Sequence, residues 1–227
     1  NVLEGCRHHQ VEHLVFASTS SVYGASTALP FSEHAAAVHP VSLYAATKRS
    51  GELMAHTYAH LFGLPVTALR FFTVYGPWGR PDMALFKFTA ALLANKPIEV
   101  YNHGHHRRDF TYVDDIVAGV VGALDQPPGA DPAWDSARPD PAIGPGPFRV
   151  YNLGHGGPVD LLRYIGVLEQ CLGRKARIEY LPLQAGDVPE TAADIRDLGA
   201  AVGYRPTTAV EVGVVRFVEW YRRFYGV

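Results

Sequence analysis

The sequence predicts an α/β fold with parallel strand pairing. Short apolar segments of strand length alternate along the chain with longer segments compatible with helices. Residues 13–17 form one such apolar segment, and four hydroxyl side chains follow directly, as expected where a buried parallel strand ends. The 227 residues, of which 48% are hydrophobic, suffice for a sizeable core in one or two domains.

The helices are predicted from helix-forming composition, apolar spacing and capping residues. Asp114 and Asp115 favour a helix start beside them, Gly173 favours a helix end, and Thr208 is a suitable cap for the last helix. In chain order, helices are expected over residues 1–6, 42–62, 83–95, 113–124, 159–172, 193–201 and 208–225.

The strands are predicted from short apolar or β-branched runs bounded by Gly and Pro. Strands are expected over residues 13–17, 65–71, 98–101, 108–112, 149–153 and 177–181. The connections rich in Gly, Pro or Ser are read as loops, at residues 25–40, 72–82, 102–106 and 182–189, with a surface insertion at 126–147.

The hydroxyl cluster is the first motif that could carry chemistry. It consists of Ser18, Thr19, Ser20 and Ser21 and follows the first predicted strand. Ligands of doubly wound sheets bind at the carboxyl ends of the strands, so polar side chains there would meet a substrate. A Ser/Thr-rich turn has the same composition, so the cluster alone does not establish a site.

Tyr44 and Lys48 form the second motif. They stand four residues apart at the start of the helix predicted at 42–62, so both side chains leave the same helix face. A nearby ammonium stabilises the phenolate form of a tyrosine, which makes the phenol a better base near neutral pH. Such a pair also arises by chance, so further motifs must decide.

Composition excludes several classes of function. A net charge of −2 does not indicate binding to nucleic acid or to an anionic membrane. The sequence shows neither an apolar run of membrane-spanning length nor a signal segment, so a cytoplasmic location is expected. Cys6 and Cys171 are too few for a disulfide framework or a zinc site, and the histidines at 103–106 lie on a loop, so no metal is expected.

Two later segments decide between chance and catalysis. RFFTVYGPWGRPD at residues 70–82 and RRDFTYVDD at 107–115 follow the first two motifs in an order and spacing that resemble the extended short-chain dehydrogenase/reductase family. The resemblance covers the whole chain and is strongest to nucleotide-sugar 4-epimerases acting on UDP-glucuronate. It implies a Rossmann-like doubly wound parallel sheet with a smaller C-terminal α/β substrate-binding part.

The resemblance also implies a division of the chain. Residues 1–72 and 113–153 would belong to the NAD-binding part, and residues 73–112 and 154–227 to the nucleotide-sugar-binding part. The family's Gly-rich turn between its first strand and first helix does not occur in this sequence, so the chain is expected to correspond to the carboxyl-terminal two thirds of such an enzyme. A non-catalytic nucleotide-sugar-binding remnant that binds NAD poorly is therefore an alternative.

The reaction implied is a redox-neutral epimerisation at carbon 4 through a 4-keto intermediate, with NAD as the cofactor. Tyr44 would take the proton of the 4-hydroxyl, Lys48 would hold the nicotinamide ribose, and Thr19 would hydrogen-bond the reacting oxygen. Related 4,6-dehydratases carry Asp-Glu after that hydroxyl and decarboxylases a Glu, whereas Ser20 and Ser21 stand there here. The further cofactor contacts implied are Ser18, Phe71, Thr73 and Val74.

The substrate contacts implied centre on three charged residues. Arg80, with Thr73 and the serines Ser20 and Ser21, is expected to recognise a sugar carboxylate, although a surface arginine is equally compatible. Arg108 is expected at the diphosphate and Asp187 at the uridine ribose, while Gln184 replaces an arginine of many galactose-type relatives and leaves a second diphosphate contact open. Residues proposed for the uracil pocket, or alternatively for the core, are Phe86, Lys87 and Phe110.

The function predicted is the conversion of UDP-glucuronate to UDP-galacturonate by a homodimer. A UDP-glucose/galactose 4-epimerase and a UDP-glucuronate decarboxylase are the alternatives among enzymes. Neither a nucleic acid nor a membrane is an expected partner.

Overall fold

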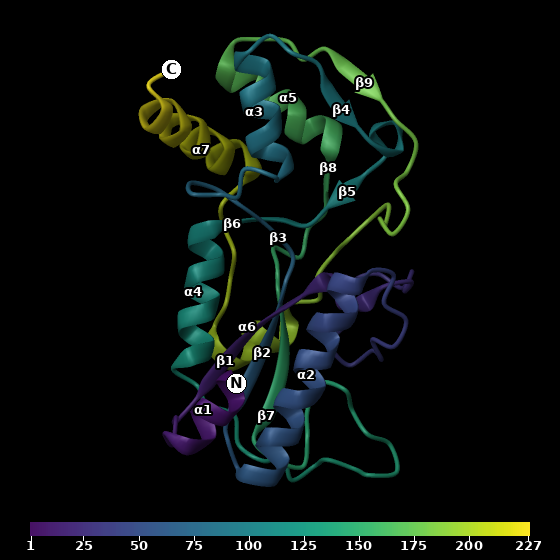
Figure 1. Ribbon diagram of the computed structural model, residues 1–227, viewed down its shortest axis with the longest axis vertical. Coiled ribbons are helices and arrows are strands. Elements are labelled where there is room, and N and C mark those ends of the chain that lie inside the picture. Colours follow the sequence, from purple (N-terminus) through teal and green to yellow (C-terminus); the bar gives the residue numbers. More distant parts are fainter.

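The computed structural model describes residues 1–227 and places them in two parts (Figure 1). A three-stranded parallel sheet forms the centre of the first part, in the order β1 (Leu14–Thr19), β2 (Val66–Phe71) and β7 (Phe148–Leu153). Thr19, Phe71 and Leu153 are in register, so the three strands end at the same edge. The predicted parallel pairing is confirmed.

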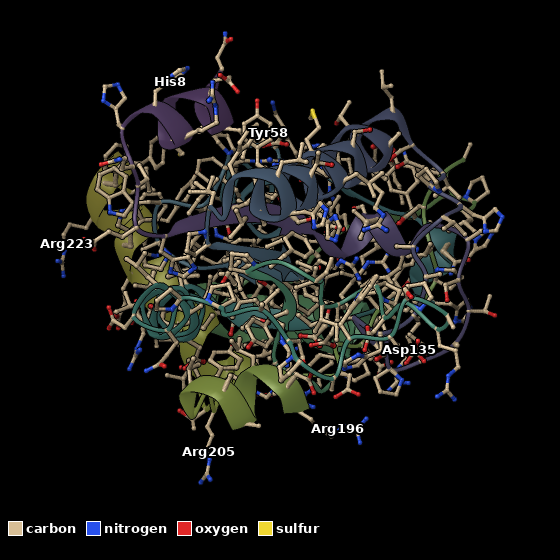
Figure 2. All side chains as sticks on the ribbon, turned by 90° about the horizontal axis from the view of Figure 1, so that it is seen from below. His8, Tyr58, Asp135, Arg196, Arg205 and Arg223 are labelled. Atoms are coloured by element: carbon tan, nitrogen blue, oxygen red, sulfur yellow. The ribbon has the colours of Figure 1, made fainter.

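Helices cover both faces of this sheet (Figure 1). Helix α2 (Leu43–Phe62) packs on one face, with α1 (Val2–His8) beside it, and α4 (Val113–Leu124) and α6 (Arg196–Val202) pack on the other. Side chains along β2 alternate between the faces, as they do in any strand: Val66 and Ala68 join the core under α2, and Leu69 joins the core under α4. Seen from below, Tyr58 on α2 and Arg196 on α6 lie on opposite sides of the molecule (Figure 2).

Local sequence accounts for the position of α2. The hydroxyl of Ser42 accepts the backbone N–H of Ala45 at 3.1 Å and caps the helix start. The helix ends at Gly63, whose φ of +65° is accessible to glycine. A Cβ atom on Gly51 would lie 2.5 Å from the Phe16 ring, so glycine lets α2 approach β1 closely.

The second part has its own core of 19 buried residues, running from Tyr75 to Tyr221. Helices α3 (Ala84–Leu93), α5 (Leu161–Leu172) and α7 (Val210–Tyr225) enclose it. The strands β4 (Ile98–Val100) and β9 (Ile178–Tyr180) pair in parallel at its edge. None of the helices in the structure combines the length and the apolar character needed to cross a bilayer.

Short strands join the two parts. β3 (Thr73–Tyr75) pairs in parallel with β6 (Phe110–Tyr112), and β5 (Arg107–Arg108) pairs antiparallel with β8 (Val159–Asp160). Single-turn 3-10 helices occupy Ser20–Tyr23 and Asn102–Gly104. The sequence predicted a loop where β3 lies, because three residues between Gly- and Pro-rich neighbours carry too little pattern to be recognised as a strand.

The strand predicted at 108–112 is interrupted at Asp109. The fully buried Asp109 carboxylate accepts backbone N–H groups of His155 at 2.6 Å, Gly156 at 3.0 Å and Ala193 at 2.9 Å. These donors come from two distant segments, so the interruption follows from tertiary contacts. The carboxylate ties β6 to the turn after β7 and to the segment before α6.

The cap of α7 and the packing of α6 also differ from the expectation. The N-cap of α7 is Ala209 and not the expected Thr208, whose backbone N–H instead donates to the Asp115 carboxylate at 3.0 Å. Helix α6 packs on α4 and β7 through the buried Leu198, although the predicted division assigned residues 154–227 to the sugar-binding part.

His34 links three segments of the first part. Its Nδ1 lies 2.6 Å from Asp140 Oδ2 and its Nε2 lies 2.9 Å from Asp197 Oδ2. Burial lowers the pKa of His34, but the bonds to Asp140 and then to Asp197 together outweigh burial, so the net pKa is raised above the ordinary 6.5. Only the protonated ring can donate to both carboxylates.

The His34 contacts predict a pH-dependent stability. A raised folded-state pKa stabilises the protein fully below about pH 6.5, and this contribution is lost as the pH rises through the folded-state pKa. Because His34 is partly exposed, we expect His34→Gln to lower the free energy of unfolding by no more than about 1 kcal/mol at acidic pH, and by less above neutrality. Urea unfolding at acidic pH and above neutrality measures this difference in the free energy of unfolding. The exposed His105 serves as control in His105→Gln, and equal pH profiles for both variants would contradict the prediction.

Candidate active site

A cleft opens where β1 and β2 end. Its cavity volume is about 580 Å³, within the range of small-molecule sites. The walls come from four segments far apart in the sequence: the end of β1, the first turn of α2, the stretch from the end of β2 through β3 and the loop after it, and the start of α4. The predicted site residues that line it are Ser18, Thr19, Ser20, Ser21, Tyr44, Phe71, Thr73, Val74 and Arg80.

Tyr44 reaches the cleft from the first turn of α2. Its side chain is 53% exposed and lines the cavity, so the ring does not belong to the hydrophobic core. The Ser42 cap fixes where the helix begins, and therefore the direction in which Tyr44 leaves it. A phenol in this position can exchange a proton with a ligand in the cleft.

Lys48 lies one turn further along α2. Its Nζ donates to the carbonyl of Ala17 on β1 at 2.9 Å and stands 6.0 Å from the centre of the Tyr44 ring. The strand therefore holds the ammonium near the phenol, as the spacing of four residues predicts.

Thr19 is buried at the wall of the cleft. Its Oγ1 accepts the N–H of Ser21 at 3.2 Å, which caps the 3-10 helix of Ser20–Tyr23, and it also lies 3.2 Å from the Ser21 hydroxyl. These bonds fix the Thr19 hydroxyl at the end of β1. The hydroxyl cluster is thus an ordered feature that shares one cavity with Tyr44.

A buried ion pair behind the cleft connects α2 to the sheet. The Glu52 carboxylate accepts Nε and Nη2 of Arg70 on β2, both at 2.9 Å, and both side chains are fully buried. Arg49 adds a bond of 2.7 Å, and the Ser18 hydroxyl also donates to Glu52. Burial raises the pKa of Glu52, but the hydrogen bonds and charge of Arg70 lower it by more, so the net shift is downward.

Sequence analysis did not identify this pair. The available signal was Arg70 within the apolar strand β2 and Glu52 on the same helix face as the small residues Ala55 and Ala59, since charged residues are rarely buried without a partner. The Ser18 hydroxyl, which was expected to contact the cofactor, donates to Glu52, although Ser18 also lines the cleft.

A second cavity of about 160 Å³ adjoins the cleft and shares Ser20, Ser21 and Thr73 with it. Arg108 and Asp187 line this cavity, and Arg108 Nη2 donates to Asp187 Oδ1 at 2.8 Å. Arg108 Nη1 donates to the carbonyl of Pro189 at 3.0 Å. The fold therefore brings together two residues that are 79 positions apart in the sequence. The family resemblance assigns both of them to the same bound nucleotide.

Comparison with known proteins agrees with this geometry. The model of the NAD dependent epimerase/dehydratase family matches residues 1–135. An uncharacterised 37.6 kDa protein of Escherichia coli O111:H- is 56% identical over 227 residues, which are 100% of this chain and 68% of that protein. The chain belongs to the NAD dependent epimerase/dehydratase family.

Two further proteins similar to this chain are named as epimerases. A probable UDP-glucuronate 4-epimerase of Rhizobium meliloti (strain 1021) is 48% identical over 99% of this chain and 66% of its own length. The crystal structure of UDP-glucuronic acid 4-epimerase from Bacillus cereus with UDP-glucuronic acid and NAD superimposes with a TM-score of 0.85 at 32% identity, over 99% of this chain and 66% of that one. The chain spans about two thirds of the length of each of these proteins.

NAD is the cofactor of this family, and it is bound in the Bacillus cereus structure. The residues present fit the nicotinamide end of such a cofactor. Phe71 and Val74 supply an apolar wall beside Tyr44, and the Lys48 ammonium supplies a donor near the end of β1. These are the groups that would hold a ribose and an aromatic ring next to the phenol.

The three residues assigned to the uracil pocket do not line the cleft, although two of them line a small cavity that shares Thr73 and Arg80 with it. Phe110 is 4% exposed and stacks on Tyr164 at 4.0 Å, so its ring belongs to the hydrophobic core. Phe86 packs on Tyr221 at 5.1 Å and lines, with Phe110, a cavity of only about 40 Å³. Lys87 is exposed on α3. The packing of Phe110 and Phe86 agrees with the alternative left open for them, the core of the second part, and a uracil contact of these residues stays a prediction.

Proposed function

We propose that the protein catalyses NAD-dependent epimerisation at carbon 4 of a UDP-sugar, converting UDP-glucuronate to UDP-galacturonate. The observation that carries this proposal is the cleft in which the exposed Tyr44, with Lys48 behind it, shares one cavity with the hydroxyl cluster at the end of β1. Family membership and the similarity to UDP-glucuronate 4-epimerases support it.

The residues of the cleft can perform the proton steps. Tyr44 takes the proton of the sugar 4-hydroxyl as the carbon–oxygen bond becomes a carbonyl, and Thr19 holds the same oxygen by a hydrogen bond. Bound NAD would supply the acceptor, and later the donor, of the hydride of carbon 4. After the keto-sugar turns over in the cleft, Tyr44 returns the proton to the oxygen, now on the other face. Lys48 stabilises the phenolate between the two transfers.

The positions after Thr19 favour epimerisation over related reactions. Elimination and decarboxylation need an additional acid or base, and the side chains at those positions are the hydroxyls of Ser20 and Ser21. Hydroxyls can orient a sugar or bind a carboxylate, but they cannot act as a base at neutral pH as a carboxylate does. We therefore expect a 4-keto sugar that is reduced again without losing a group.

Product analysis tests the proposed function. The full chain is incubated with NAD and UDP-glucuronate, and the nucleotide sugars are followed by NMR. UDP-galacturonate as the product, without release of carbon dioxide, is the expected result. Release of carbon dioxide would identify a decarboxylase instead, and turnover of UDP-glucose but not of UDP-glucuronate would identify a galactose-type epimerase.

The sugar carboxylate is assigned to Arg80. In the structure Arg80 Nη2 donates to Asp82 Oδ2 at 2.8 Å, and its side chain, 71% exposed, reaches the cleft wall. A substrate carboxylate offers the same bidentate geometry as Asp82. Thr73, Ser20 and Ser21 line the same cavity and can complete the site with hydroxyl donors.

Arg80→Ala is therefore expected to weaken the binding of UDP-glucuronate by about ten- to a hundredfold, the usual effect of losing a hydrogen-bonded charge pair. Its affinity for UDP should stay unchanged. Isothermal titration calorimetry with the two ligands measures both. Arg196 provides the matched control, because it also pairs with a carboxylate two residues away, Asp194, but lies on α6, on the far face of the sheet from α2. Equal affinity of Arg80→Ala and Arg196→Ala for UDP-glucuronate would refute the assignment.

A further inference from the structure

The loop that carries Arg80 has an unusual backbone. Trp78 has a φ of +62°, a left-handed conformation that bulky side chains rarely adopt. Gly76 has a φ of +140°, and a Cβ atom there would lie 2.7 Å from Val113, so this end of the loop is held against α4. The N–H of Gly79 donates to the Gly76 carbonyl at 3.1 Å and closes a turn around Trp78. Such a strained residue persists only where its surroundings hold it.

Two aromatic side chains of α7 hold Trp78. Its ring centre lies 5.4 Å from that of Trp220 and 5.1 Å from that of Phe224, the latter edge-on. Trp220 and Phe224 are four residues apart and therefore on one face of α7, and they stack on each other at 5.5 Å. We call Trp78, Trp220 and Phe224 the aromatic clamp. It joins the wall of the cleft to the last two turns of α7.

Burial does not explain the clamp. Trp78 is 73% exposed, and Phe224 is 53% exposed, so both rings remove little apolar surface from water. What the contacts do is orient the loop. Trp78 lies two residues before Arg80, and Trp78, Arg80 and Met83 all line the cleft beside Tyr44. A turn that rotated freely about Gly76 and Gly79 would carry Arg80 to many positions.

We propose that Trp78 is a positioning residue for substrate binding. The aromatic clamp fixes the turn 76–79 against α7, and this places the Arg80 guanidinium where it meets the carboxylate of an acidic sugar. This role rests on the proposed function, because it assigns the clamp to recognition of the sugar acid. It distinguishes a UDP-sugar acid from UDP itself, since UDP offers no carboxylate to Arg80.

Calorimetric titration of the full chain with UDP-glucuronate and with UDP tests the role. Trp78→Ala and Phe224→Ala should each weaken UDP-glucuronate binding by about threefold to tenfold, the effect of one aromatic pair. Neither should change the affinity for UDP. Trp78→Phe keeps an aromatic ring in the clamp and should restore most of the affinity. The double variant Trp78→Ala with Phe224→Ala should bind no more weakly than Trp78→Ala, because both changes break the same contact.

Tryptophan fluorescence provides a readout of the clamp itself. The chain has three tryptophans, and Trp134 lies outside the clamp, so Trp134→Phe leaves Trp78 and Trp220 as the emitting pair. Phe224→Ala in this background should expose Trp78 further and shift its emission to the red.

The outcomes separate the two proposals. Unchanged affinity of Trp78→Ala for UDP-glucuronate, or an equal loss for UDP and UDP-glucuronate, would overturn the positioning role and leave the proposed function standing. A wild-type chain that binds UDP-glucuronate no better than UDP would overturn the assignment of Arg80 and the role of the clamp together.

Discussion

Tyr44→Phe is expected to lower the rate of carbon-4 epimerisation by about two to four orders of magnitude, the usual contribution of a general acid–base group. The change removes only the phenolic oxygen and keeps the ring that lines the cleft. The lost oxygen is the one to which the proposed function assigns the proton transfer, on a ring whose centre lies 6.0 Å from the Lys48 Nζ. Initial rates with UDP-glucuronate, measured by NMR at saturating substrate, give the effect on kcat.

A second tyrosine of α2 serves as the control for this experiment. The Tyr58 hydroxyl bonds to Glu4 on α1, so Tyr58→Phe removes the same atom from the same helix but outside the cleft. We expect nearly unchanged turnover from Tyr58→Phe. Binding of UDP should be unchanged in both variants, because neither oxygen contacts the second cavity that contains Arg108. If Tyr44→Phe kept more than about a tenth of the wild-type rate, Tyr44 would not be the proton-transfer residue.

Glu52→Ala is expected to reduce the free energy of unfolding by about 3 to 5 kcal/mol, as is usual when one member of a buried ion pair is removed. The Arg70 guanidinium would remain fully buried without the carboxylate that accepts its two N–H groups at 2.9 Å. Urea unfolding followed by circular dichroism measures the loss. The exposed pair of Arg163 and Glu211, at 2.6 Å, is the matched control, and Glu211→Ala should cost less than about 1 kcal/mol.

Two further measurements test whether the broken ion pair causes the loss of stability in Glu52→Ala. Replacing both partners, Glu52→Leu with Arg70→Met, should recover much of the stability, because no uncompensated charge then remains buried. The pKa of Glu52 is lowered in the folded state, so its contribution is present above the unfolded value of about 4.5 and is lost as the pH falls through the folded-state pKa. A Glu52→Ala variant as stable as Glu211→Ala would show that solvent reaches Arg70.

The ion pair also has a consequence for the cleft. Glu52 follows Lys48 by four residues on α2, and its carboxylate accepts the hydroxyl of Ser18 at the end of β1. The pair therefore sets the register between the helix that carries Tyr44 and the strand that ends in Thr19. We expect the conservative Glu52→Gln to lose catalytic rate along with stability.

Some features of the site were predictable because they depend on residues close together in the sequence. Tyr44 and Lys48 share a face of α2 because helix geometry relates positions four apart, whatever packs around them. Thr19 lies at the carboxyl end of β1 because the hydroxyl cluster to which it belongs follows an apolar run. Local sequence could not decide between the two places expected for Phe110, a ligand pocket or the core, because its stacking partner Tyr164 lies more than 50 residues away.

The amino-acid sequence by itself determined the alternating elements, the parallel sheet and the motifs of the NAD dependent epimerase/dehydratase family. Only the tertiary structure decided which distant side chains meet: Arg108 with Asp187, Glu52 with Arg70, and Trp78 with Trp220. The physical reason is that hydrophobic periodicity and turn chemistry act over a few residues, whereas the partner of a buried charge or a strained aromatic ring is set by how whole elements pack.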